Sequence, residues 1–118
     1  MTAVEDLLIE LLKIESVSGN EKGVGNFIIK RLEKNFEVKT LKVNNNFNIL
    51  AIKGNPKILI SAHIDTVPGK LDIRKDKNFI YGRGSCDTKS QVASGIIAGE
   101  KAVADGLTDF ALMFTVEE

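Results

Sequence analysis

In the stretch ILISAHIDTVPG, residues 58–69, an apolar run leads directly into the only histidine of the chain. Asp65 follows His63 by two positions, and a Pro-Gly turn comes next. The residues of KILISAH are apolar on both faces of an extended chain, and such runs belong in the middle of a sheet that is covered on both sides. This stretch therefore predicts a buried strand that ends at His63.

The segments on either side have the periodicities of helices and strands. Apolar residues at helical spacing predict three helices, over residues 3–14, 24–32 and 88–105, the second of them with a cap at Ser18 or Asn20. Alternating or apolar runs predict further strands over residues 36–43, 47–54 and 109–116, and a small polar hairpin over residues 70–81. This order predicts a mixed α/β fold, with a mostly parallel central sheet and helices on both faces.

Composition narrows the class of protein. The 118 residues carry 16 basic and 16 acidic side chains, which argues against nucleic acid or an anionic membrane as a partner. One cysteine allows no internal disulfide, and no apolar run approaches the ~20 residues of a membrane span. The acidic, periodic N-terminal stretch lacks the layout of a signal peptide. We therefore expect a cytoplasmic protein.

Polar residues follow two of the predicted strands at their carboxyl ends. His63 ends one strand, Glu117 and Glu118 end another, and Asp87 stands just before the helix that connects the two. Ligand sites of open α/β sheets lie beyond the carboxyl ends of the strands. If the two strands are parallel and joined by a right-handed crossover, all of these residues share one edge of the sheet.

An imidazole surrounded by carboxylates is a ligand set for a divalent metal such as zinc. Asp65 lies two residues from His63 and can support the ring from behind, since alternate residues of an extended chain point the same way. Adjacent residues point oppositely, so one of Glu117 and Glu118 can bind metal while the other acts as a general base.

Each of these residues also has an ordinary structural explanation. His63 can be a hydrogen-bonded residue at a strand end, Asp65 a turn former and Asp87 a helix cap, while glutamates at a chain end are usually solvated. Their occurrence together at the predicted edge favours the metal site.

Three stretches, SAHIDTVP, YGRGSCDTKSQVASGIIA and FTVEE, resemble the zinc aminoacylase and carboxypeptidase family, with the motifs in the family's order and spacing. That family includes acetylornithine and acetyl-lysine deacetylases, succinyl-diaminopimelate desuccinylase and glutamate carboxypeptidase. The resemblance implies two divalent ions, zinc or cobalt, and a cis peptide between Asp87 and Thr88. It also implies five site residues: His63 as a metal ligand, Asp65 as its supporting catalytic carboxylate, Asp87 as the bridging ligand, Glu117 as the general base and Glu118 as a ligand of the second metal.

The resemblance implies that residues 1–118 are the N-terminal part of the metallohydrolase catalytic domain, without the remainder of that domain or the dimerisation domain. We expect this chain to be inactive by itself and to associate through an exposed edge of its last strand. At full length the family resemblance implies a homodimer.

The activity implied by the resemblance is hydrolysis of an N-acyl amide, with an acetylated diamino acid such as ornithine or lysine as first choice, in amino-acid biosynthesis. Dipeptidase or carboxypeptidase activity on short peptides is the second choice within the family. An aminopeptidase with a related two-metal site and a non-catalytic α/β interaction module are two further possibilities.

Overall fold

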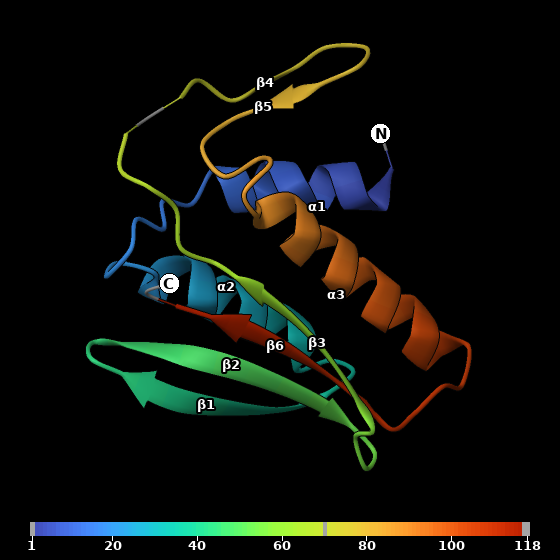
Figure 1. The fold of residues 1–118 in the computed structure, drawn as a ribbon. Helices are drawn as coiled ribbons and strands as arrows, with labels where there is room; N and C mark the ends of the chain where they lie inside the picture. The colour runs from blue at the N-terminus through green and yellow to red at the C-terminus, as the bar shows by residue number, and fades with distance from the viewer. Residues whose placement is uncertain (1, 70, 117–118) are drawn as a thin grey trace.

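The computed structural model describes residues 2–69 and 71–116 and contains three helices packed on a sheet (Figure 1). The helices are α1 (Ala3–Leu12), α2 (Lys22–Leu32) and α3 (Lys89–Ala104). The strands are β1 (Glu37–Val43), β2 (Asn46–Lys53), β3 (Ile58–His63), β4 (Arg74–Lys75), β5 (Ile80–Tyr81) and β6 (Phe110–Thr115). Within the described ranges, every helix is too short or too polar to cross a membrane.

The four-stranded sheet has the order β1-β2-β6-β3, and β4 and β5 form a separate hairpin. β3 and β6 are parallel and are connected through α3, as predicted. The mixed α/β class is confirmed, but the expectation of a mostly parallel sheet is wrong, because β1–β2 and β2–β6 are antiparallel. The short turn between β1 and β2 can only join antiparallel strands, and β2 then places its other edge against β6.

All three helices lie on one side of the sheet, which corrects the expectation of helices on both faces. In α2, a Cβ added to Gly25 would lie 2.9 Å from the ring of Phe47, and in α3 one added to Gly99 would lie 2.9 Å from Leu112. Phe47 shares a face of β2 with Ala51, which pairs with Leu112, so both helices pack on the same face. α1 packs against α3 and adds its buried leucines to the same core.

The predicted central strand β3 lies at the edge of the sheet instead. Ile58, Leu59 and Ile60 have exposed fractions of 64%, 55% and 50%. β6, which we expected to be the exposed strand, lies between β2 and β3. Within the described residues, the two edge strands of the sheet are therefore β1 and β3, and β6 is an interior strand.

The start of α2 is held by a distant residue rather than by a local cap. Its N-cap is Glu21, so the predicted cap at Ser18 or Asn20 is wrong. The backbone N–H of Glu21 donates to Asn46 Oδ1 at 3.1 Å, and Asn46 Nδ2 donates to the carbonyl oxygen of Gly19 at 2.9 Å. The side chain of Asn46 thus supplies from β2 the acceptor that a helix start needs.

Candidate metal centre

His63 stands at the carboxyl end of β3, where β3 and β6 separate. It is paired in register with Thr115, and the N–H of Ile64 donates to the carbonyl oxygen of Thr115 at 2.8 Å. Glu117 and Glu118 follow two and three positions after Thr115 in sequence and lie outside the described residues. The crossover predicted from the sequence thus brings the ends of β3 and β6 to the same edge of the sheet.

Asp87 reaches this edge from the loop between β5 and α3. His63 Nε2 and Asp87 Oδ1 are 2.9 Å apart, and the two side chains have exposed fractions of 15% and 83%. The N-cap of α3 is Thr88, so Asp87 is not the cap of that helix. The peptide between Asp87 and Thr88 is cis, as the resemblance implied. The structure therefore brings His63 and Asp87 together as predicted.

Asp65 lies on the opposite side of the imidazole ring. His63 Nδ1 is 3.0 Å from the carbonyl oxygen of Asp65 and 3.2 Å from its Oδ1, and Asp65 is 7% exposed. Both ring nitrogens of His63 therefore face oxygen atoms that accept hydrogen bonds or bind cations. A proton on Nδ1 would leave the Nε2 lone pair directed at the carboxylate of Asp87, an arrangement that a divalent ion between them would satisfy.

The loop between α1 and α2 holds the segment around Asp65. Val17 forms an isolated parallel bridge with Thr66. The N–H of Thr66 donates to the carbonyl oxygen of Ser16 at 2.8 Å, and the N–H of Ser18 donates to the carbonyl oxygen of Thr66 at 3.1 Å. These bonds fix the backbone on the carboxyl side of Asp65, whose side chain lies beside Nδ1 of His63.

An open cavity of about 520 Å³ lies beside these residues and is lined by His63, Asp65, Asp87, Arg83 and Ser18, among others. No group of three or more His, Cys, Asp or Glu side chains within residues 2–69 and 71–116 surrounds a single point closely enough to hold a metal. The reason is that Asp65 contacts the Nδ1 side of the ring while Asp87 contacts the Nε2 side. His63 and Asp87 fit one ion as a partial ligand set.

Lys89, two residues after Asp87 in sequence, is a buried residue for which no role was predicted. It is 2% exposed, and its Nζ donates to the carbonyl oxygens of Leu11 at 2.9 Å and Ile14 at 2.7 Å. Burial lowers the pKa of Lys89 to about 8, and the charge of Glu15 opposes that effect. These bonds tie the segment that carries Asp87 to the end of α1.

A signal for the burial of Lys89 was present in the sequence. Lys89, Val92, Ala93 and Ile96 follow the i, i+3, i+4, i+7 spacing, which places the lysine on the apolar stripe of α3. A cation in the first turn of a helix is disfavoured by the helix dipole, so it needs acceptors elsewhere, and the carbonyl groups at the end of α1 provide them.

Relatives of this chain are hydrolases or contain peptidase domains. A peptidase M20 domain-containing protein of Schizosaccharomyces pombe is 38% identical over 119 residues, which cover 92% of this chain and 30% of that protein. A LysW-lysine/LysW-ornithine hydrolase of Saccharolobus islandicus is 36% identical over 113 residues, covering 89% of this chain and 32% of the relative. The chain thus spans about a third of the length of these relatives.

The fold is also similar to that of a solved structure about three times as long as this chain. An M20 family metallo-carboxypeptidase from Sulfolobus solfataricus superimposes with a TM-score of 0.77 at 23% identity, over 97% of this chain and 30% of that one. The sequence model described as peptidase family M20/M25/M40 matches residues 59–118, which include the strand of His63, the loop of Asp87 and both terminal glutamates. With more than half of its length matched by that model, the chain belongs to peptidase family M20/M25/M40.

Proposed function

We propose that the protein containing this chain is a metal-dependent hydrolase that cleaves the amide of an N-acylated diamino acid, such as an acetylated ornithine or lysine. The contact between His63 Nε2 and Asp87 Oδ1, with Asp65 behind the ring, is the observation that carries the proposal. The 36% identity to a LysW-lysine/LysW-ornithine hydrolase supports the substrate class, because both substrates in that relative's name contain a diamino acid.

In this proposal two divalent ions, zinc or cobalt, would supply Lewis acidity to the scissile carbonyl and to the attacking water. His63 and Asp87 would hold them together with Glu118 and with residues from outside the 118. Asp65 keeps the proton of His63 on Nδ1, so that the lone pair of Nε2 points toward Asp87 and can bind an ion. Glu117 acts as the general base: it takes a proton from the attacking water and delivers it to the leaving amine.

Metal binding tests the site independently of activity. In the complete protein, calorimetric titration with zinc or cobalt should show binding. Asp87→Asn should weaken that binding strongly, because it replaces the charged carboxylate beside His63 with a neutral amide. Asp105→Asn is the matched control, since it makes the same change at the other end of α3, and it should bind as the wild type does. Absence of binding in the wild type would favour the non-catalytic module.

The role of Glu117 is tested by separating turnover from metal content. Glu117→Ala should lower kcat by roughly 10²–10⁴-fold, the usual contribution of a general base, while metal content stays near that of the wild type. Glu33→Ala, at an exposed glutamate at the end of α2, is the control. Equal loss of metal and turnover in Glu117→Ala would show that the roles are assigned wrongly.

A second candidate is a carboxypeptidase, which the similarity in fold to the metallo-carboxypeptidase of Sulfolobus solfataricus favours. Both reactions hydrolyse an amide with the same proton transfers, so the site residues would act identically. Comparing kcat/KM for N-acetyl-ornithine and N-acetyl-lysine with that for dipeptides separates the two. Faster cleavage of dipeptides would select the carboxypeptidase.

A further inference from the structure

The end of β6 is held on both of its sides. On the β3 side, the N–H of Ile64 donates to the carbonyl oxygen of Thr115 at 2.8 Å. On the β2 side, the regular ladder ends at the pair Ile49–Phe114. Beyond that pair, the N–H of Val116 donates to the side-chain Oδ1 of Asn48 at 2.9 Å. A side chain thus takes the place of a backbone acceptor at the last described residue before Glu117.

An asparagine is an unexpected residue at position 48, in the interior of β2. Asparagine is depleted in strands, and its neighbours on β2 are Phe47 and Ile49. Asn48 is half-buried and pairs with Leu41 of β1, surroundings that would also suit an apolar side chain. Its hydrogen bond to Val116 spans 68 positions in sequence, so it belongs to the tertiary structure and not to the β1–β2 turn.

We propose that Asn48 is a positioning residue for Glu117 and Glu118, an inference that rests on the function proposed above for those glutamates. The N–H that Asn48 accepts from belongs to the Thr115–Val116 peptide, one peptide group before Glu117, and the orientation of that peptide influences the direction in which the chain continues. Adjacent residues of an extended chain point to opposite sides. A rotation at Val116 therefore misdirects the general base and the metal ligand together.

The size of the expected effect follows from the geometry of catalysis. A displacement of about 1 Å in a reacting group can cost roughly 100-fold in rate, even when the mutation lies outside the chemistry. Loss of the Asn48 acceptor leaves the N–H of Val116 without its partner, and the peptide is then free to turn toward solvent. Substrate binding away from the glutamates is unaffected, so the loss falls on kcat.

The experiment uses the complete protein with Asn48→Leu, which has similar size and no acceptor, and with Asn48→Ala as a second variant. Asn48→Asp is the conservative variant, because it retains an oxygen acceptor at the same place. Ile49→Val is the matched control on the same strand, since it removes one buried methylene group from the core and leaves the bond to Val116 intact. Ile49→Val shows what a loss of thermal stability does by itself.

Asn48→Leu and Asn48→Ala should lower kcat by roughly 10- to 100-fold with KM within about threefold of the wild type. The peptide that contains Val116 should exchange its amide hydrogens with solvent faster in these variants, and cobalt should bind more weakly. Asn48→Asp should restore the protection of that peptide and most of kcat. Ile49→Val should retain kcat within about twofold, whatever its melting temperature.

Two results would overturn the proposal. One is a kcat in Asn48→Leu and Asn48→Ala that equals the kcat of the wild type. The other is an equal loss of kcat in Ile49→Val, when its melting temperature matches that of the Asn48 variants. If the wild type hydrolyses neither N-acyl amino acids nor dipeptides, the proposed function fails. Hydrogen exchange and cobalt affinity then still decide whether Asn48 holds the end of β6, so the two failures are distinguishable.

Discussion

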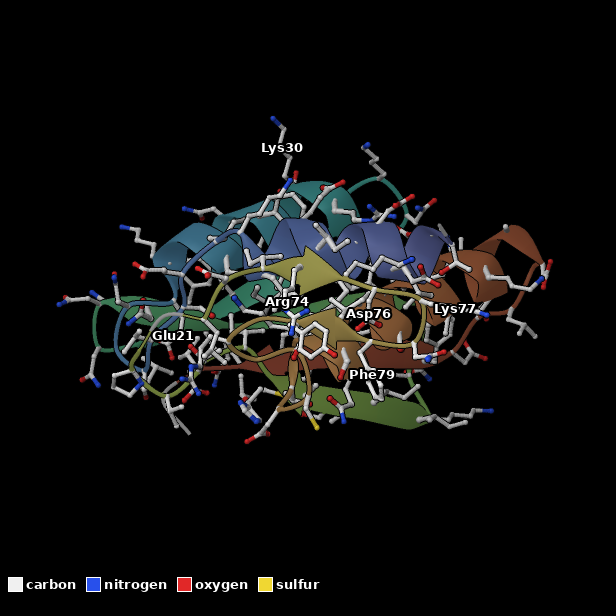
Figure 2. All side chains as sticks on the ribbon, turned by 90° about the horizontal axis from the view of Figure 1, so that it is seen from above. Glu21, Lys30, Arg74, Asp76, Lys77 and Phe79 are labelled. Carbon is white, nitrogen blue, oxygen red and sulfur yellow. The ribbon has the colours of Figure 1, made fainter. Side chains whose placement is uncertain are left out.

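The side chains of His63 and Lys89 are both held by groups that other segments of the chain supply. His63 is held between the carboxylates of Asp65 and Asp87, so the two nitrogens of one ring have different tasks. Lys89 remains buried because the end of α1 offers it two carbonyl oxygens. In the β4–β5 hairpin, Figure 2 shows Arg74, Asp76 and Phe79 gathered at the surface.

Asp76 controls the ionisation of the only tyrosine of the chain. Its Oδ1 accepts from the N–H groups of Asn78 and Phe79 at 2.8 Å each, and its Oδ2 accepts from Tyr81 at 3.0 Å. These bonds, that from Asn78 first, lower the pKa of Asp76. The hydrogen bond to Asp76 raises the pKa of Tyr81 above its ordinary value, because the carboxylate stabilises the protonated phenol.

We therefore predict that the phenol of Tyr81 titrates above its ordinary midpoint in the 118-residue chain. Asp76→Asn should move that midpoint down toward about 10, since the neighbouring negative charge is lost. The near-ultraviolet absorbance of the phenolate measures it directly, because the chain contains one tyrosine and no tryptophan. Asp72→Asn, in the same polar segment, is the control, and an unchanged midpoint in Asp76→Asn would contradict the prediction.

Between elements, α2 and α3 are joined by one ion pair of favourable geometry. Arg31 Nε lies 2.9 Å from Glu100 Oε2, and its other donor, Nη2, lies 3.0 Å from Oε1. The two side chains are 31% and 21% exposed. The hydrogen bond to Glu100 raises the pKa of Arg31. A carboxylate accepts both parallel bonds of a guanidinium, whereas a glutamine amide has one oxygen and can accept only one of them.

Glu100→Gln should lower the free energy of unfolding by about 0.5–1 kcal/mol, a value reduced by the partial exposure of the pair. Urea unfolding provides the measurement, and added salt should reduce the difference. The exposed pair of Lys101 and Asp105 serves as the comparison, because its side chains are 76% and 59% exposed. If Asp105→Asn costs as much as Glu100→Gln, the Arg31 bridge has no special role.

At the scale of the whole molecule, the two edge strands of the sheet, β1 and β3, differ in the side chains that they carry. β1 carries charged residues along its length, namely Glu37, Lys39 and Lys42, and charged side chains discourage pairing with other strands. β3 instead exposes three consecutive large apolar residues, Ile58, Leu59 and Ile60. An uncharged apolar edge of this kind is a template for pairing with another strand.

The 118-residue chain by itself should therefore self-associate through β3. Leu59→Lys should shift it toward the monomer in sedimentation velocity, because a charge on the edge opposes strand pairing. Thr40→Lys makes the corresponding change on β1, at the opposite edge, and should leave the distribution unchanged. A monomeric wild type, or an equal effect of both substitutions, would contradict the prediction.

Features of the fold that depend on local periodicity or on the connection between two strands were predictable. The helix and strand periods located α1, α2, α3 and the four strands of the sheet, and the crossover rule predicted that β3 and β6 are parallel. The meeting of His63 with Asp87 followed from that pairing. The edge position of β3 did not follow, since an apolar run does not specify which neighbours are present.

Spacing along the chain was enough to predict which segments become helices and strands and which residues stand at the ends of β3 and β6. The three-dimensional fold was needed to reveal the strand order β1-β2-β6-β3, the packing of all three helices on one face, and the hydrogen bonds of Asn46, Asn48 and Lys89. These contacts join residues 25, 68 and 78 positions apart. Their partners are main-chain groups that every residue possesses, so no side-chain pattern could reveal them in advance.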